Sequence, residues 1–308
     1  MDLWDEMRTA YQVAKLGTIT AAAEALGVHR ATVIRQVDRL EAELGAKLFL
    51  RHSGGYTPTE VGQDLLQVAA TTDEQFNELA GRLRGQAQVL KGELVVTSAE
   101  FFVPIVTHAL RPLLRNNPNL KIRYRATREL LKLEFGDAHL AIRTGSKPNK
   151  PDFVVQPFLK ISSGLYAHAD YVDQYGKPRS PADFSDHYFV CGEPDGLRPQ
   201  FLDWLPQTVP KERIALASNS VNVQFSAIES GLGIGFFPTI YAAQKTNLVE
   251  VMPPREEWEV DAWLVTHVDL HRSDKVQTCL SSLKRALVDY GADKMDKHSI
   301  PVLSPAST

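Results

Sequence analysis

Arg30, Arg35 and Arg39 lie close together in the sequence, and arginine side chains on an exposed helix can recognise DNA. Apolar residues three and four positions apart predict a helix from His29 or Arg30 to Leu44. Its predicted core-facing residues are Val33, Val37, Leu40 and Leu44. The opposite face holds Ala31, Arg35, Asp38 and Ala42, flanked by Thr32, Arg39 and Ile34. Such a face can enter the DNA major groove, where arginine reads guanine and small apolar groups meet the thymine methyl.

An isolated helix with three arginines is more often a solvated surface helix, so its neighbours decide the interpretation. The apolar residues between Leu3 and Ala14 predict a first helix that stops near Gly17. A second helix is predicted at 21–26, with Thr20 as its N-cap. Two helices joined by a short glycine-containing turn, the second one exposed and basic, are typical of a helix-turn-helix.

Several short sequence segments at fixed spacing extend this pattern. They are residues 16–26, 33–35, 40–51 and 59–62. At this spacing the segment resembles the winged helix-turn-helix of the LysR-type transcriptional regulators. The resemblance implies that the recognition helix begins near Arg30 and that Gly54 and Gly55 form the tip of the wing.

The chain departs from that family at positions that bear on DNA recognition. His29-Arg30-Ala31 stands where Ser-Gln-Pro is usual, Ile34 replaces a usual serine, and the wing lacks the common arginines. We expect Arg30 and Arg35 to read bases and Arg51 to hold the phosphate backbone. The DNA-binding candidates are Thr20, His29, Arg30, Ala31, Thr32, Ile34, Arg35, Arg39, Arg51 and Tyr56.

A long helical pattern follows from Glu60 to Leu90. Its apolar positions alternate steps of four and three, the seam of a coiled coil. The dimerisation candidates on this seam are Leu65, Ala69, Thr72, Phe76, Leu79 and Leu83. The alternative is a helix packed on its own domain, but about 30 residues, or roughly 45 Å, exceed what so small a domain can cover. We therefore expect a homodimer, or a homotetramer by the resemblance, on a partial inverted repeat of double-stranded DNA.

Beyond Gly92 the composition changes, because seventeen of the eighteen prolines follow it among strands that alternate with helices. The predicted strands are 94–98, 121–125, 140–143, 164–168, 188–191, 213–218, 234–237 and 258–268; the predicted helices are 103–115, 128–135, 198–205, 221–230 and a last one from Val276 to Tyr290. The region resembles the two-lobed α/β effector domain of the same regulators, which is similar to periplasmic binding proteins.

The predicted fold class is therefore α plus α/β, in four parts. They are a winged helix-turn-helix (1–62), a dimerising linker helix (63–91), an effector-binding domain (92–291) and a mobile tail (292–308). Within the effector domain, lobe one is expected at 92–162 and 269–291, and lobe two at 163–268.

Ligands of open α/β sheets bind beyond the carboxyl ends of the strands, beside helix N-termini. The effector-binding candidates are Ser98, Ala99, Glu100, Thr127, Arg128, Arg143, His168, Asn219, Ser220 and Phe237. The resemblance implies contacts at Ser98 and Thr127, although helix capping explains single polar residues equally well. For His168, a structural role is the more frequent one for a histidine at the end of a strand, ahead of ligand binding. Arg128 and Arg143 would suit an effector that carries a carboxylate, whereas the negative charge of Glu100 favours a neutral or zwitterionic effector.

No catalytic, metal or cofactor site is predicted, because the sequence holds no nucleophile elbow, phosphate-binding lysine loop or zinc-ligand spacing. Two cysteines, Cys191 and Cys279, and the absence of a signal or membrane-spanning segment favour the cytoplasm. The whole chain carries a net charge of −3, but residues 8–58 carry +3. The sequence thus predicts a DNA-binding regulator under effector control, with RNA polymerase as a further candidate partner. The alternatives are a redox switch at Cys191 and an enzyme on a binding-protein fold.

Overall fold

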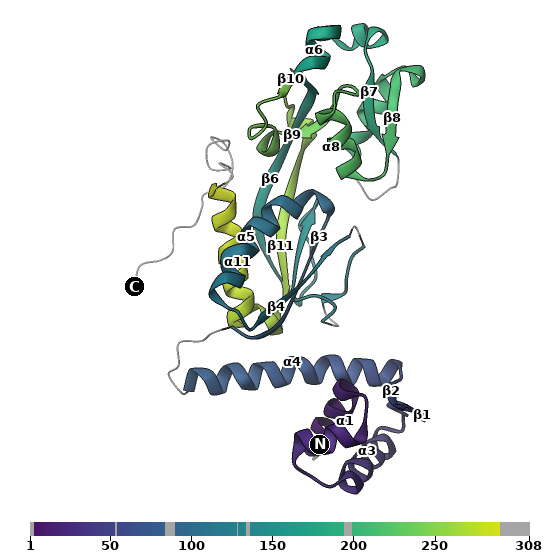
Figure 1. Cartoon of the computed structure of the whole chain (residues 1–308), viewed down its shortest axis with the longest axis vertical. Coiled ribbons are helices and arrows are strands. Elements are labelled where there is room, and N and C mark those ends of the chain that lie inside the picture. Colours follow the sequence, from purple (N-terminus) through teal and green to yellow (C-terminus); the bar gives the residue numbers. More distant parts are fainter. Residues whose placement is uncertain are drawn as a thin grey trace. The chain divides into compact units, whose positions relative to one another are not determined.

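The computed structural model describes residues 3–52, 54–83, 90–127, 129–133, 136–193 and 199–289. They fall into two compact units, one built mainly from residues up to 83 and the other mainly from residue 90 onwards (Figure 1). The predicted tail, 292–308, lies outside the described residues. Among the described helices, none is long and apolar enough to cross a membrane.

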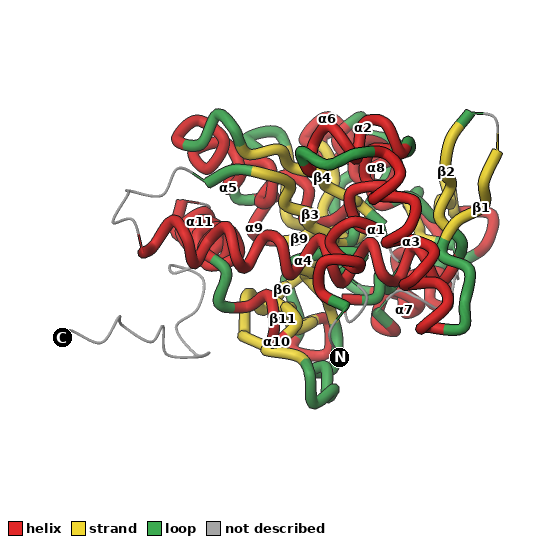
Figure 2. Tube along the Cα trace, turned by 90° about the horizontal axis from the view of Figure 1, so that it is seen from below, coloured by secondary structure: helices red, strands yellow, loops and turns green. Residues whose placement is uncertain are grey.

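The first unit is a three-helix core with a β-hairpin and a long helix. Its elements are α1 (Trp4–Leu16), α2 (Ile19–Leu26), α3 (Arg30–Leu44), β1 (Phe49–His52), β2 (Gly55–Pro58) and α4 (Glu60–Leu83). The antiparallel strands pair from Phe49 with Pro58 to His52 with Gly55, and Figure 2 shows this hairpin standing out from the helices. The predicted winged helix-turn-helix is confirmed.

The expected N-cap of the second helix is wrong by two residues. The Thr18 hydroxyl accepts a hydrogen bond from the Ala21 N–H at 3.2 Å, and Thr18 has the extended backbone of an N-cap. Thr20 is therefore an exposed residue in the first turn of α2. The helix starts earlier because Ile19 is buried in the core of this unit.

The described part of α4 has 24 residues, a length of about 36 Å. The predicted coiled-coil seam does not continue to Leu90. That residue is buried in the core of the second unit, together with residues of the first strand there. Its apolar side chain therefore marks the start of the next unit rather than the end of the linker.

The second unit is built on a sheet with the strand order β10-β6-β11-β5-β3-β4, and β9 pairs with β6 off this path. These strands are β3 (Gly92–Ser98), β4 (Leu120–Ala126), β5 (Leu140–Thr144), β6 (Phe153–His168), β9 (Gly235–Pro238), β10 (Leu248–Met252) and β11 (Glu259–His267). The parallel pair β7 (Phe189–Gly192) and β8 (Ile214–Ser218) forms a separate sheet. β3 is parallel to β4 and β5, whereas β11 is antiparallel to β5 and β6.

Helices cover this sheet and link its strands. They are α5 (Val103–Asn116), α6 (Ala169–Tyr175), α7 (Trp204–Thr208), α8 (Val221–Glu229), α9 (Thr239–Ala242), α10 (Val268–His271) and α11 (Asp274–Asp289), with short 3-10 turns η1 (Glu100–Phe102), η3 (Pro181–Asp186), η4 (Gln200–Asp203), η5 (Lys211–Arg213) and η6 (Glu256–Trp258). α5 and α11 lie side by side on one face of the sheet in Figure 1. One buried apolar cluster continues from that face into the second lobe, through Phe102, Phe158 and Phe237.

Four predicted elements differ from the structure. The helix expected at 198–205 is instead the 3-10 turn η4 followed by α7, which begins at Trp204 and continues to Thr208. The helix expected at 128–135 is wrong, since the described residues 129–133 form no α-helix. β6 is one strand of 16 residues that passes through both lobes, where only 164–168 was predicted. β11 was assigned to lobe two, but it pairs with β5 and with the first half of β6, which makes it part of lobe one.

Candidate nucleic-acid interface and effector site

α3 exposes the face that the sequence predicted. Val33, Val37 and Leu40 are fully buried against α1 and α2. The exposed residues are His29, Arg30, Ala31, Ile34, Arg35, Asp38, Arg39 and Ala42, and Thr32 is half-buried. A solvent-facing helix that follows a tight turn is the arrangement by which helix-turn-helix proteins reach base edges.

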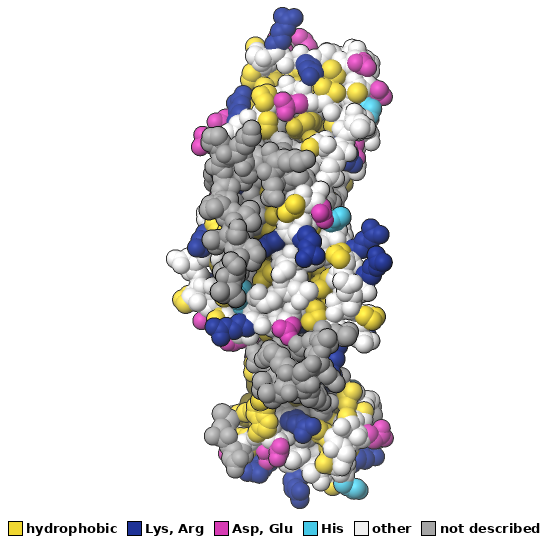
Figure 3. Space-filling model, turned by 90° about the vertical axis from the view of Figure 1, so that its left-hand side faces the viewer, with side chains coloured by type: hydrophobic (Ala, Val, Ile, Leu, Met, Phe, Trp, Pro, Cys, Tyr) yellow, Lys and Arg dark blue, Asp and Glu magenta, His cyan; other side chains and the backbone are white. Residues whose placement is uncertain are grey.

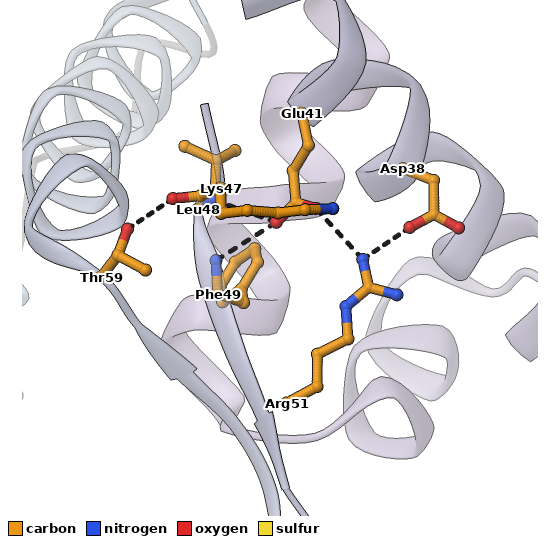
Figure 4. Close-up of polar contacts among 7 residues, drawn as sticks. All are labelled: Asp38, Glu41, Lys47, Leu48, Phe49, Arg51 and Thr59. Atoms are coloured by element: carbon orange, nitrogen blue, oxygen red, sulfur yellow. Dashed lines mark hydrogen bonds and ion pairs between the residues drawn. The ribbon is translucent and has the colours of Figure 1, made fainter. Parts of the chain in front are cut away.

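Glu41 is a buried carboxylate that joins α3 to the wing (Figure 4). Its side chain is 2% exposed, and its Oε1 accepts hydrogen bonds from the N–H groups of Leu48 at 2.9 Å and Phe49 at 3.2 Å. Its Oε2 pairs with Lys47 Nζ at 2.7 Å and with Arg51 Nη2 at 3.2 Å. Burial alone raises the pKa of this carboxyl, but these donors outweigh it and hold the pKa below its ordinary value. Glu41 therefore stays charged and fixes the start of β1 to α3.

Arg51 is held by the protein itself. The same Nη2 that contacts Glu41 also pairs with Asp38 on the exposed face of α3, as Figure 4 shows. The Asp38 carboxylate raises the pKa of the Arg51 guanidinium, so this group remains positively charged. The guanidinium also lies over the Tyr56 ring, 5.4 Å from its centre. A DNA phosphate would therefore have to share Arg51 with Asp38, which the sequence did not predict.

Asp38→Asn is expected to raise the affinity for all DNA sequences severalfold. The change frees Arg51 from its ion pair and removes a negative charge from the face of α3, so one more phosphate contact forms. Fluorescence anisotropy at several salt concentrations measures this as a steeper salt dependence. Glu43→Gln, which removes an exposed charge from the same helix, is the matched control. Equal effects of the two variants would show that Arg51 is not limited by Asp38.

Arg39 also has a partner within the unit. Its Nη1 pairs with the buried carboxylate of Glu6 on α1 at 2.8 Å. One turn away, the Thr9 hydroxyl donates to Gln36 Oε1 at 2.9 Å, so two polar contacts lock α3 onto α1. Arg30 and Arg35 make no ion pair among the described residues, which leaves their guanidinium groups available to a ligand.

The wing is positioned by close backbone contacts. Gly55 has φ of 136°, and a Cβ there would overlap the carbonyl oxygen of Gly17 at the end of α1. The next residue, Tyr56, donates its N–H to that same oxygen at 2.8 Å. Gly62 lets α4 approach β1, because a Cβ there would overlap the carbonyl oxygen of Leu48. The Thr59 hydroxyl donates a hydrogen bond to the Lys47 carbonyl of the same segment at 2.7 Å. Thr59 and Gly62 therefore hold the start of α4 close to the residues before β1, which is the structural role of the sequence motif at 59–62.

The linker helix leaves apolar side chains in solvent. Val68 is 69% exposed, and Phe76 is 54% exposed although its ring makes an edge contact with Trp4, itself 55% exposed. Leu65, by contrast, packs against the core of its own unit. Ala69 and Thr72 are half-buried, and the side chains of Leu79 and Leu83 lie outside what the structure describes. The sequence missed Val61 and Val68, exposed residues seven positions apart on the same side of α4.

In the second unit, several effector candidates gather where β3 ends. Ser98 is buried, and its hydroxyl lies 2.7 Å from the Tyr124 hydroxyl on β4. Burial raises the pKa of Tyr124 and the hydrogen bond to Ser98 opposes it, with a net rise. The Ser98 carbonyl accepts from the Thr127 N–H at 2.8 Å, which brings the ends of β3 and β4 together. Tyr124 was missed, although it lies on the same half-buried face of β4 as Ile122, in alternation with exposed Lys and Arg residues.

Glu100 connects the two lobes. Its Oε2 accepts hydrogen bonds from the Ser220 hydroxyl at 3.2 Å and from Asn222 Nδ2 at 3.4 Å, both at the N-terminus of α8. Beside it, Tyr241 of α9 donates its hydroxyl to the Phe101 carbonyl at 2.8 Å. A carboxylate of the protein thus occupies the position where a helix N-terminus would attract an anionic ligand.

Other candidates lie elsewhere. His168 ends β6 and caps α6, where its Nδ1 accepts from the Asp170 N–H at 3.2 Å, so it does not join the group around Ser98. Phe237 is buried in the core against Phe225 and Tyr166. Arg143 donates to the Leu131 carbonyl at 3.0 Å. Ala99 is half-buried, Asn219 is exposed beside Ser220, and Arg128 lies outside the described residues.

A shallow groove of about 410 Å³ follows α8 on lobe two. It is lined by Leu216, Asn222, Val223, Ser226, Ala227, Ser230 and Leu232. Asn222 belongs both to this groove and to the Glu100 contact. Among the described residues, no cluster of His, Cys, Asp and Glu could hold a metal ion.

Comparison with known sequences decides which family this architecture represents. Residues 4–63 match the bacterial regulatory helix-turn-helix of the lysR family, and residues 87–288 match the LysR substrate binding domain. The chain belongs to the LysR family of transcriptional regulators. The winged helix-turn-helix is therefore a DNA-binding domain, and the two-lobed unit is an effector-binding domain.

Individual LysR-type relatives agree with this assignment. A probable transcriptional regulator LtrA of Klebsiella pneumoniae is 25% identical, covering 100% of this chain and 98% of that protein. The Mau operon transcriptional activator of Paracoccus denitrificans is 26% identical over 87% of this chain and 90% of the activator. Among solved structures, ArgP from Mycobacterium tuberculosis has a TM-score of 0.61 at 18% identity, covering 91% of this chain and 96% of that one. A full-length OxyR variant from Pseudomonas aeruginosa has a TM-score of 0.60 at 19% identity, covering 92% and 95%. The two structures support the fold.

The two cysteines of this LysR-type chain are buried. Cys191 is 2% exposed on β7, and Cys279 lies on the apolar face of α11. Burial raises the pKa of the Cys279 thiol to about 12, so this group is a neutral thiol at physiological pH. Thiolate chemistry needs the opposite environment, a low pKa and access to solvent.

Proposed function

We propose that this regulator reads its operator with the exposed face of α3. The observation that carries the proposal is that the exposed side chains of Arg30 and Arg35 on α3 make no ion pair among the described residues, while Arg39 and Arg51 are held by acidic neighbours. Free guanidinium groups can make the paired hydrogen bonds to guanine O6 and N7 that distinguish base pairs. Arg51, shared with Asp38, is assigned to the phosphate backbone.

The regulator acts as a homodimer or a higher oligomer on a partial inverted repeat. Two recognition helices related by a two-fold axis meet adjacent major grooves on one side of the DNA. Residues 8–58 of one protomer carry a net charge of only +3, and on the face drawn in Figure 3 Lys and Arg side chains lie singly among neutral and acidic ones. We therefore expect a shallow salt dependence for each protomer and useful affinity only through oligomerisation.

Val68→Asp is expected to shift the protein towards the monomer and to weaken DNA binding. Val68 is the most exposed large apolar residue described on α4, so a charge there would be buried against the partner helix. Light scattering after size-exclusion chromatography, over a range of protein concentrations, gives the oligomeric state. Val288→Asp, at an exposed valine of α11, is the matched control. A Val68→Asp protein with unchanged mass would mean that this side of α4 does not pair.

The effector is expected between the two lobes, at the ends of β3 and β4 and at the N-terminus of α8. Ser98, Glu100, Thr127 and Ser220 supply the polar contacts, and the Glu100 carboxylate favours a neutral or zwitterionic molecule. To change transcription, this molecule must bind one arrangement of the protein better than another.

Thermal-shift screening of the full chain against a panel of metabolites tests effector binding, since a ligand of the folded state stabilises it by mass action. A stabilising neutral or zwitterionic metabolite whose effect disappears in Ser98→Ala and Ser220→Ala supports the site. Stabilisation that persists in both variants places the ligand elsewhere. RNA polymerase is a further partner through which the DNA-bound protein would act, in the cytoplasm where its operator lies.

The two alternative functions have less support. A redox switch would need an oxidant to reach Cys191, which is buried on β7. A catalytic role would need a reactive group. The described polar side chains at this site form hydrogen bonds with one another, Ser98 with Tyr124 and Ser220 with Glu100, as is common in a binding site. We therefore assign no enzymatic activity to the chain.

A further inference from the structure

His29 occupies the N-cap of the recognition helix, where its ring has a fixed orientation. Its Nδ1 accepts a hydrogen bond from the Ala31 N–H at 3.3 Å, and its backbone has the extended conformation of an N-cap residue. The side chain is exposed, at the end of α3 from which helix-turn-helix proteins contact base edges. The ring is therefore held at the DNA-facing surface by a bond to its own helix.

This hydrogen bond determines where the ring carries its proton. A nitrogen that accepts a bond from a backbone N–H cannot itself be protonated, so the neutral imidazole holds its hydrogen on Nε2. Since the two ring nitrogens point away from each other, the Nε2–H projects beyond the first turn of α3.

His52 on the wing provides a contrast. Its Nδ1 accepts from the Gly54 N–H at 3.1 Å, and its Nε2 lies 2.9 Å from the Thr57 hydroxyl. Both nitrogens of His52 are used within the hairpin. For His29, the described contacts involve Nδ1 alone.

We propose that His29 is a specificity-determining residue that donates its Nε2–H to an acceptor on a purine edge in the major groove. Guanine offers N7 and O6 there, whereas cytosine presents a donor that this nitrogen cannot accept. The inference rests on the proposed reading of DNA by α3 and adds a base preference beside those of Arg30 and Arg35. Serine at this position would cap the helix but carries no imidazole N–H, so the preference is particular to the histidine.

The test uses the full chain and a duplex selected by the wild-type protein from a random library. Each position of each half-site is replaced in turn by the other bases, and affinities are measured for the wild type and for His29→Ser, which keeps an N-cap oxygen. We expect one purine per half-site whose replacement by cytosine weakens wild-type binding about fivefold or more and leaves His29→Ser binding within twofold. Replacement of that purine by its 7-deaza analogue, which lacks the N7 acceptor, should reproduce the difference.

Two results would overturn the inference. One is a His29→Ser protein that keeps the wild-type preference at every position. The other is a uniform loss of affinity for selected and random duplexes, which would make His29 a phosphate contact. If the wild-type protein selects no sequence at all, the proposed function itself fails, and this outcome is separate from the other two.

Discussion

Glu41→Ala is expected to destabilise the DNA-binding unit by about 2 kcal/mol, the range found when buried hydrogen-bond donors lose their acceptor. The change leaves the Leu48 and Phe49 N–H groups and the Lys47 ammonium without their acceptor. Hydrogen exchange of the full chain reports this locally, as faster exchange of the Leu48 and Phe49 amides. Loss of DNA binding should accompany it, because β1 is no longer fixed to α3.

Glu43→Ala is the matched control, because it removes an exposed carboxylate from the same helix. It should leave these two amides protected. Unchanged exchange at Leu48 and Phe49 in Glu41→Ala would contradict the role given to Glu41.

The stabilisation from Glu41 also depends on pH. Because the folded protein lowers the pKa of this carboxyl, the stabilisation is complete above its ordinary value of 4.5 and is lost as pH falls through the lowered folded value. The difference in stability between the wild type and Glu41→Gln should therefore shrink only in strongly acidic solution.

Arg35→Ala is expected to remove sequence discrimination while retaining much of the non-specific affinity. A paired hydrogen bond from arginine to guanine is worth about 1 to 3 kcal/mol for each protomer on the DNA. The affinities measured for a selected operator and for a scrambled duplex should therefore become more similar. The salt dependence should stay close to that of the wild type, since the groups that bind phosphate remain in place.

Arg8→Ala is the control for charge, because Arg8 is an exposed arginine of α1 in the same unit. It should keep the preference for the operator. If Arg35→Ala weakens both duplexes equally, Arg35 binds phosphate and the assignment of base reading to this residue is wrong.

Local patterns predicted the recognition helix well. Apolar spacing placed it within one residue of the observed α3, because an amphipathic helix buries one face whatever the rest of the fold does. The role of Glu41 was not predicted. Two of its partners, Phe49 and Arg51, lie on β1, and only the folded contact between α3 and β1 makes a buried carboxylate favourable.

Longer-range packing explains the predictions that failed. β6 contains Pro157, and a proline within an apolar run usually indicates that a strand ends there. In the structure, the pairing of β6 with β11 shifts register at this point, between Ala262 opposite Leu159 and Trp263 opposite Pro157. The irregularity accommodates the proline and lets the strand continue. Around 129–133, backbone groups bind side chains instead of forming a helix, with the Thr127 hydroxyl on the Glu129 N–H and Arg143 on the Leu131 carbonyl.

Two of the residues proposed for effector binding are in contact. Glu100 and Ser220 were named because they follow a strand or precede a helix, and the Ser220 hydroxyl donates to the Glu100 carboxylate. His168 and Phe237 were named for the same reason, because each lies at or near the end of a predicted strand. Their positions depend on the full length of β6 and on the core between the lobes, which no local pattern revealed.

Selection of duplexes from a random library by the wild-type chain tests directly whether a dimer reads its operator through α3. We expect enrichment of a partial inverted repeat whose half-site centres lie about 10 base pairs apart, or a multiple of this. Each half-site should contain a guanine that the wild type prefers and that Arg35→Ala no longer distinguishes from other bases. Recovery of an unenriched library, or of a single half-site without a dyad, would contradict this proposal.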